Sequence, residues 1–183
     1  MNQSDSNALL ARFEFRQIRP EETQQAIWIE QVCFPPNEAC SPESMRERIE
    51  RAPELFLVAV DRSTCRIAGF LNGLSTEETK FRDEFFTDIG LHDPNGAVVM
   101  LLGLDVLPEY RGQGLARQIV AQYCRRQMGK QLLILTCHAE KVPMYRKFGF
   151  EDQGLSGSTW GGERWHEMIY RLSGGAVGDT FTK

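Results

Sequence analysis

The chain has 183 residues, enough for one domain with a substantial hydrophobic core. A net charge of −4 disfavours a nucleic-acid partner, which usually requires a basic surface, and without a long apolar segment we expect neither a signal peptide nor a membrane-spanning helix. The five cysteines are odd in number and form no C-x-x-C pair, so we expect reduced thiols in a cytoplasmic protein and no metal site.

The first half of the chain alternates helical and extended patterns after a polar start. Residues 1–11 are expected to be a loose, flexible tail. Apolar residues that alternate or run continuously predict strands over 12–18, 55–60 and 66–74. Helical spacing and serine or proline start signals predict helices over 20–33 and 41–52.

The second half carries the most apolar run of the chain. It follows residues 75–96, which we expect to form a charged loop with a short helix near 80–86. Residues 97–107 predict a central buried strand, and an amphipathic helix is predicted over 114–128. Further elements are predicted over 131–137 (strand), 141–148 (helix), and 150–154 and 164–172 (strands). Residues 173–183 are expected to be a second flexible tail, which leaves one domain over 12–172.

Two glycines stand where the predicted strand over 97–107 gives way to a helix. Gly112 and Gly114 keep side chains away from the helix N-terminus, whose free backbone N–H groups attract phosphate oxygens. A Rossmann fingerprint would need a glycine at Arg117, and a nucleotide P-loop would need Gly-Lys-Ser/Thr, so both are excluded. A tight turn without a ligand is the alternative.

The turn "RGQGLA" over 111–116 has an arginine, two residues, a glycine, one residue and an alanine. Between an apolar strand and an amphipathic helix, this pattern resembles the acetyl-coenzyme A signature of the GNAT superfamily of N-acetyltransferases. The segment "LLILTCHAEKVPMYRKFGFEDQG" is similar to the family's next strand, helix and Y-x-x-x-G-F element. The segments "FEFRQIRPEE" and "IEQVCFPPNEACSPESMRERI" resemble its arylalkylamine (serotonin-type) branch.

The resemblance implies the GNAT α/β fold, in which helices flank a mixed, mostly antiparallel sheet. A bulge splays the central strand of this fold from its neighbour, and Gly103 is a suitable seat for it. The family uses acetyl-CoA as cosubstrate and no metal. The pantetheine arm of acetyl-CoA would pair with the backbone of Leu104, Asp105 and Val106. The other implied acetyl-CoA-binding residues, most of which would hold the pyrophosphate through backbone amides, are Arg111, Gly112, Gln113, Gly114, Leu115, Ala116, Arg117 and Tyr145.

Acetylation of an amine by a thioester needs both a base and an acid. An alkylamine is mostly protonated at pH 7 and attacks only when neutral, and the departing thiolate must receive a proton. The resemblance assigns the acid to Tyr145, four residues before Gly149. Core packing beside Phe148 is the alternative reading of this tyrosine.

The base is harder to place. The vertebrate enzymes of the branch relay the amine proton through two histidines on the central strand, and the matching positions here are Met100 and Leu102. The resemblance to insect members makes Glu38 the first candidate, with Glu30 and Asp105 as second choices. For Glu38 the alternative is an exposed loop carboxylate without a role.

The acceptor would lie under the loop over 34–42, where Phe34, Pro35 and Pro36 would form apolar walls. Such walls suit an aryl or alkyl amine, and the surrounding acidic residues could equally attract a polyamine. We therefore expect an enzyme that transfers acetyl from acetyl-CoA to a small primary amine by direct attack in a ternary complex. Acetylation of a protein N-terminus or lysine, and CoA binding without turnover, are the alternatives.

Overall fold

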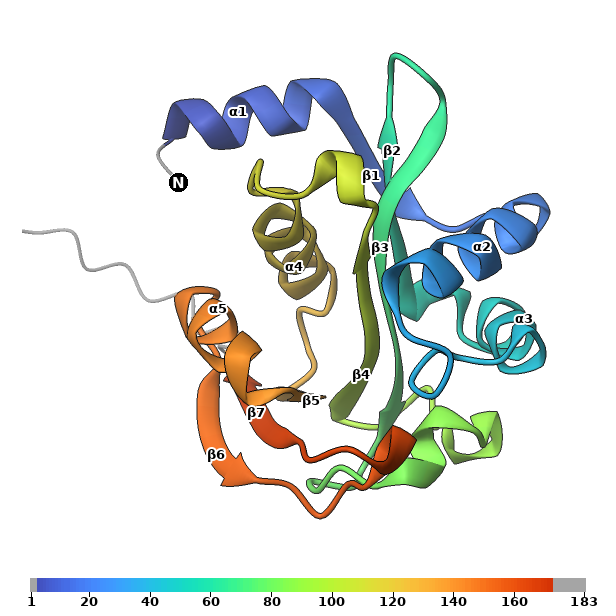
Figure 1. Cartoon of the computed structure of the whole chain (residues 1–183), viewed down its shortest axis with the longest axis vertical. Coiled ribbons are helices and arrows are strands. Elements are labelled where there is room, and N and C mark those ends of the chain that lie inside the picture. Colours follow the sequence, from blue (N-terminus) through green and yellow to red (C-terminus); the bar gives the residue numbers. More distant parts are fainter. Residues whose placement is uncertain (1–2, 173–183) are drawn as a thin grey trace, which may run out of the picture.

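The computed structural model describes residues 3–172, in which helices cover both faces of a seven-stranded sheet (Figure 1). The strands run in the order β1-β2-β3-β4-β5-β7-β6, and neighbours are antiparallel except β4 and β5, which are parallel. Their bounds are β1 Phe13–Gln17, β2 Phe56–Asp61, β3 Arg66–Thr76, β4 Val98–Val106, β5 Leu132–Cys137, β6 Glu151–Leu155 and β7 His166–Arg171. The expected mixed, mostly antiparallel sheet is confirmed.

The helices divide between two hydrophobic clusters. Their bounds are α1 Gln3–Arg12, α2 Thr23–Cys33, α3 Pro42–Arg51, α4 Leu115–Arg126 and α5 Val142–Lys147. On one face, α2 and α3 pack against the sheet, where Ile29 joins Phe70 of β3. On the other face are α1, α4 and α5, and there Ile119 joins Leu71 of β3. Because successive strand residues point to opposite faces, β3 contributes to both clusters.

The loose tail expected over residues 1–11 is corrected by the structure. Residues Gln3–Arg12 form α1, and Leu9, 7% exposed, lies in the same hydrophobic cluster as α4. This helix has few apolar residues, so its stability depends on its tertiary contacts rather than on an apolar repeat that a sequence would reveal. The other expected tail, 173–183, lies outside the described residues.

The central strand β4 diverges from β5 partway along its length. The two strands pair through Val98–Met100 and Leu132–Ile134, whereas β3 follows β4 as far as Val106. Beyond Ile134, β5 stays paired with β7. The sheet therefore opens between β4 and β5, as the resemblance implied.

A bulge lies at the point of divergence. Asn72 of β3 is paired with Gly103 of β4. The next residue, Gly73, is paired with Leu101, so Leu102 is an extra residue on β4. An extra residue bends the strand that carries it and increases its twist. The bulge is thus next to Gly103, the seat expected for it.

Candidate active site

A cavity of about 330 Å³ lies between the diverging strands. This volume is at the lower end of the range for small-molecule sites, about 300–1,000 Å³. Its wall combines β4, β5, α5 and two loops that are far apart in the sequence. The predicted site residues that line it are Phe34, Glu38, Leu104, Val106, Arg111, Ala116 and Tyr145.

Some predicted residues lie away from this wall. Pro35 and Pro36 are exposed, so Phe34 is the member of the three predicted acceptor walls that faces the cavity. The side chain of Asp105 is fully buried and is not part of the cavity wall, although its strand neighbours are. Arg111 lines the cavity, and its Nε donates to the backbone oxygen of Val106 at 2.8 Å.

The glycine turn joins β4 to α4 and leaves its backbone accessible. Gly112 and Gly114 have φ angles of +73° and +85°, in the left-handed region that favours glycine. Gly114 precedes the first residue of α4, Leu115 is buried beneath the turn, and Arg117 is exposed in the first turn of the helix. A Cβ at Gly112 would meet no atom of the described residues within 4 Å. The free N–H groups at the start of α4 are therefore open to an anion.

Tyr145 of α5 lines the cavity and belongs to an aromatic cluster. Its ring meets the rings of Phe148 and Phe150 edge to face, with centroids 5.9 and 5.5 Å away. Burial raises the pKa of the Tyr145 hydroxyl above its usual range, so the group stays a protonated donor well above neutral pH. Both readings of the tyrosine are compatible with this position, because Tyr145 packs in the cluster and also lines the cavity.

Glu38 is paired with a histidine that the sequence analysis did not assign a role. The Nε2 atom of His138 lies 3.1 and 3.2 Å from the two carboxylate oxygens of Glu38. The carboxylate is 8% exposed, which contradicts the alternative of an exposed loop acid. Because the two residues are 100 positions apart, no local sequence pattern could have paired them.

Two tryptophans complete the wall around this pair. The ring of Trp165 stacks on His138 at 4.3 Å, and Trp160 donates from Nε1 to the backbone oxygen of Glu38 at 2.8 Å. Trp160 also stacks on Phe86, with ring centroids 4.7 Å apart. The sequence analysis missed all three aromatic residues. The available signal was the pair of tryptophans in "STWGGERW", a polar loop where large apolar side chains are unusual.

Glu30 of α2 and Asp105 of β4 form a buried carboxyl pair beside Gly103. A Cβ at Gly103 would lie 3.1 Å from Oδ2 of Asp105 and 3.4 Å from Oε2 of Glu30. Neither of these oxygens has a hydrogen-bond partner among the described residues. Burial raises the pKa of both groups, and for Asp105 the charge of Glu30 adds to the effect. Glu30 also lines the cavity.

The described residues contain neither a metal-binding cluster nor a membrane-spanning helix. No group of three or more His, Cys, Asp or Glu there could hold a metal ion. In the same part of the chain, no helix is long and apolar enough to cross a membrane.

A family profile and a curated relative match this chain. The profile of the acetyltransferase (GNAT) domain matches residues 52–152. The relative is the serotonin N-acetyltransferase of Mesocricetus auratus, 27% identical over 161 residues, which cover 85% of this chain and 75% of the hamster protein.

Solved structures share the fold at low sequence identity. The loading GNATL domain of CurA from Lyngbya majuscula superposes with a TM-score of 0.75 and is 18% identical, over 87% of this chain and 98% of that domain. A phosphinothricin acetyltransferase from Sinorhizobium meliloti, solved in complex with acetyl-CoA, gives a TM-score of 0.63 at 18% identity, over 93% of this chain and 94% of that one. At these identities the likeness concerns the fold.

Proposed function

The chain belongs to the GNAT family of acyl-CoA-dependent N-acetyltransferases, and on this premise we propose that it transfers acetyl from acetyl-CoA to a small primary amine. The observation that carries the proposal is the cavity between β4 and β5, which combines Tyr145, Glu38 and an aromatic wall in about 330 Å³. A lined cavity of this size suits a small acceptor better than a protein chain, which needs an open groove.

The residues present fit acetyl-CoA along the opening of the sheet. The accessible backbone at Gly112 and the start of α4 suit the pyrophosphate. The edge of β4 beyond Met100, from which β5 has diverged, offers backbone groups to the peptide-like pantetheine arm. Bound there, the cosubstrate supplies the acetyl thioester whose carbonyl carbon an amine attacks.

We assign the acid to Tyr145 and the base to Glu38 acting through His138. The neutral amine nitrogen forms a C–N bond with the acetyl carbon while the C–S bond breaks. The excess proton on nitrogen passes to the imidazole of His138, whose positive charge the carboxylate of Glu38 stabilises from 3.1 Å. Tyr145 donates its hydroxyl proton to the departing sulfur. Glu30 and Asp105 stay the second choice as proton acceptors.

The cavity wall favours an arylalkylamine as the acceptor. Phe34, Phe86, Trp160 and Trp165 line it, and such rings bind an aromatic group through their faces and edges. Glu38 and Glu30 in the same wall would attract the ammonium form of the amine. A polyamine would use the carboxylates and leave the aromatic wall without a partner, so we rank it second.

An amine panel tests the proposal. The purified chain would be assayed with acetyl-CoA and 2-phenylethylamine, spermidine or a lysine-containing peptide, with release of free thiol as the readout. We expect kcat/KM to be at least about tenfold higher for the arylalkylamine than for the others, since about 1.4 kcal/mol of ring contacts suffices for that ratio. Preference for the peptide would indicate a protein acetyltransferase. CoA binding without thiol release from any amine would indicate a binding module.

The five cysteines also bear on location. All of them are free thiols in the structure, and burial raises the pKa of four, Cys33, Cys40, Cys124 and Cys137, to about 11 or 12. Free thiols persist in a reducing compartment, which supports the cytoplasmic location that we propose.

A further inference from the structure

The N-terminal helix α1 lies beside the start of α4, next to the glycine turn (Figure 1). Leu9 of α1 and Leu115 of α4 share one hydrophobic cluster. The hydroxyl of Ser6 donates to Oε1 of Gln118 at 3.1 Å, and the backbone N–H of Arg62 donates to the backbone oxygen of Arg12 at 3.0 Å. These contacts hold the end of α1 at a defined place relative to the turn.

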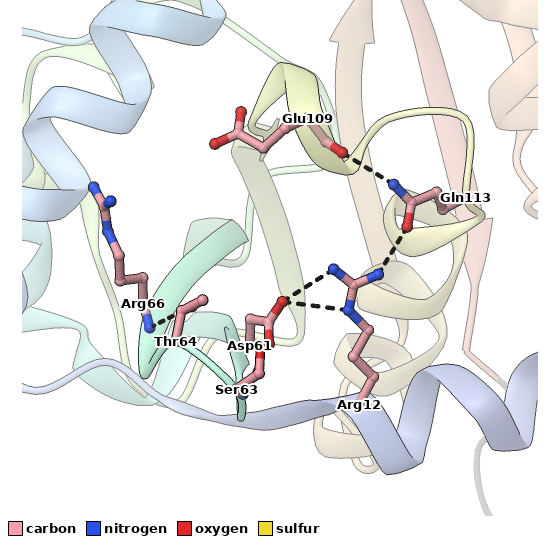
Figure 2. Close-up of polar contacts among 7 residues, drawn as sticks. All are labelled: Arg12, Asp61, Ser63, Thr64, Arg66, Glu109 and Gln113. Atoms are coloured by element: carbon pink, nitrogen blue, oxygen red, sulfur yellow. Dashed lines mark hydrogen bonds and ion pairs between the residues drawn. The ribbon is translucent and has the colours of Figure 1, made fainter.

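The last residue of α1 forms hydrogen bonds with both strand β2 and the glycine turn. The guanidinium of Arg12 donates from Nε and Nη2 to Oδ2 of Asp61, at 3.3 and 3.1 Å, and from Nη1 to Oε1 of Gln113 at 3.0 Å. Gln113 in turn donates from Nε2 to the backbone oxygen of Glu109 at 3.0 Å, as Figure 2 shows. One arginine therefore links strand β2 to the middle of the glycine turn.

The anchor of this link on β2 is rigid and charged. Asp61 is 1% exposed, and its second oxygen accepts from the backbone N–H and the hydroxyl of Ser63 at 2.9 and 2.6 Å. The hydrogen bonds from Ser63, followed by the contact with Arg12, lower the pKa of Asp61, so its carboxylate is ionised at neutral pH. The guanidinium also lies 4.9 Å above the ring of Phe13 and 5.4 Å from that of Tyr110.

Hydrogen bonds from Arg111 to Val106 and from Gln113 to Glu109 hold the glycine turn from within, and its middle is open to solvent. Gly112 and Gln113 are exposed, and a Cβ at Gly112 would have no described neighbour within 4 Å. Glycine has the largest conformational freedom of any residue, so an unrestrained turn would lose much entropy on binding a ligand. A hydrogen bond from a fixed arginine restricts the residue between the two glycines already in the free protein. The turn therefore loses less conformational entropy when the ligand binds.

We propose that Arg12 is a positioning residue for CoA binding: it holds Gln113 and so keeps the backbone of the glycine turn in the conformation that receives the pyrophosphate. The inference rests on the proposed function of that turn. It makes α1, which lies outside the family profile match over 52–152, a working part of the cosubstrate site. Arg12 acts through Gln113 and not by touching the substrate.

A double-mutant cycle tests this link. CoA affinity would be measured by calorimetry for the wild-type chain, Arg12→Met, Gln113→Ala and the double variant. We expect each single change to weaken CoA binding about three- to thirtyfold, and the double variant to be no weaker than the worse single variant, because both remove the same contact. In turnover assays, KM for acetyl-CoA should rise while kcat changes less than about twofold.

Two further variants separate positioning from charge and from damage to the fold. Arg12→Lys keeps the charge but not the planar fork that reaches Asp61 and Gln113 together, so it should resemble Arg12→Met. Arg66→Met removes a matched charge from the exposed end of β3, whose side chain points away from Arg12 in Figure 2, and should leave affinity unchanged. If Arg12→Met unfolds, Gln113→Ala tests the same contact from the exposed side.

The results that would contradict the role of Arg12 differ from the result that would contradict the proposed function. Additive losses in the double variant, or full affinity in Arg12→Lys, would mean that Arg12 acts by its charge on the phosphates and would overturn the inference. Unchanged affinity in Arg12→Met would do the same. If the wild-type chain does not bind CoA at all, the proposed function fails, and the inference fails with it.

Discussion

At the scale of single residues, the chemistry of the cavity depends on side chains whose environments differ sharply. Burial raises the pKa of Tyr145, Glu38 contacts His138, and Glu30 lies next to a second carboxyl group. Each environment makes a different prediction for a substitution that keeps the shape of the side chain and removes one function.

Tyr145→Phe removes the proposed acid and keeps the ring contacts with Phe148 and Phe150. We expect kcat to fall about 10²- to 10⁴-fold, the usual range for a positioned acid, with a much smaller change in KM for acetyl-CoA. Tyr170→Phe is the matched control, because Tyr170 contacts Phe150 in the same aromatic cluster and is not part of the cavity wall. Full activity in Tyr145→Phe would return this residue to a packing role.

Glu38→Gln keeps the size of the proposed base and removes the charge that stabilises a protonated His138. We expect the rate to fall, because without the carboxylate charge His138 is a weaker acceptor for the proton of the attacking amine. The measurement is the pH–rate profile of both forms with one good amine. Equal rates across the range would exclude Glu38 and leave Glu30, or the free-base fraction of the substrate, as the explanation.

Glu30→Gln tests the buried carboxyl pair through stability. A carboxyl group whose pKa is raised by folding stabilises the protein at low pH and loses that contribution as the pH rises through its folded pKa. The wild-type free energy of unfolding should therefore fall more between pH 5.5 and pH 8 than that of Glu30→Gln. Denaturant unfolding at both values measures this, with Glu50→Gln on the exposed side of α3 as control. Parallel pH dependence in the two proteins would contradict it.

At the level of secondary-structure elements, the turn between β4 and α4 has a backbone suited to ligand binding rather than to packing. Its glycines allow left-handed backbone angles, and its position at the start of α4 leaves amides free. Helix α1 contributes to the same site from outside, through Arg12 and Gln113. The site is therefore assembled by contacts between elements rather than by the turn alone.

Gly114→Val should abolish CoA binding in calorimetry while the protein stays folded. A β-branched residue at a φ of +85° is strained, and its side chain would obstruct the amides at the start of α4. Gly129→Val is a matched control, because Gly129 has a φ of +107° at the other end of α4 and carries a similar strain. Both variants should lose stability in a thermal melt. Undiminished CoA affinity in Gly114→Val would contradict the assignment of the turn.

At the scale of the whole molecule, the divergence of β4 and β5 turns a continuous sheet into one with an internal opening. The bulge at Leu102 bends β4 where it leaves β5, and β3 stays paired with β4 on the other side. The opening lets residues from α2, the loop after it, β5 and α5 approach the same cavity. A sheet paired along its full length would have filled this space with backbone hydrogen bonds.

Because periodicity and glycine are local signals, the sequence predicted the strands, helices α2 to α5 and the glycine turn at the start of α4. The resemblance to the GNAT family placed the bulge near Gly103. It also singled out Tyr145 and Glu38. The contact of Glu38 with His138, and that of Arg12 in an unexpected helix with Gln113, depend on the folded structure, since each pair joins residues about 100 positions apart. Such pairs form because packing of the sheet and helices brings distant segments together. Residue spacing along the chain does not reveal which distant segments meet.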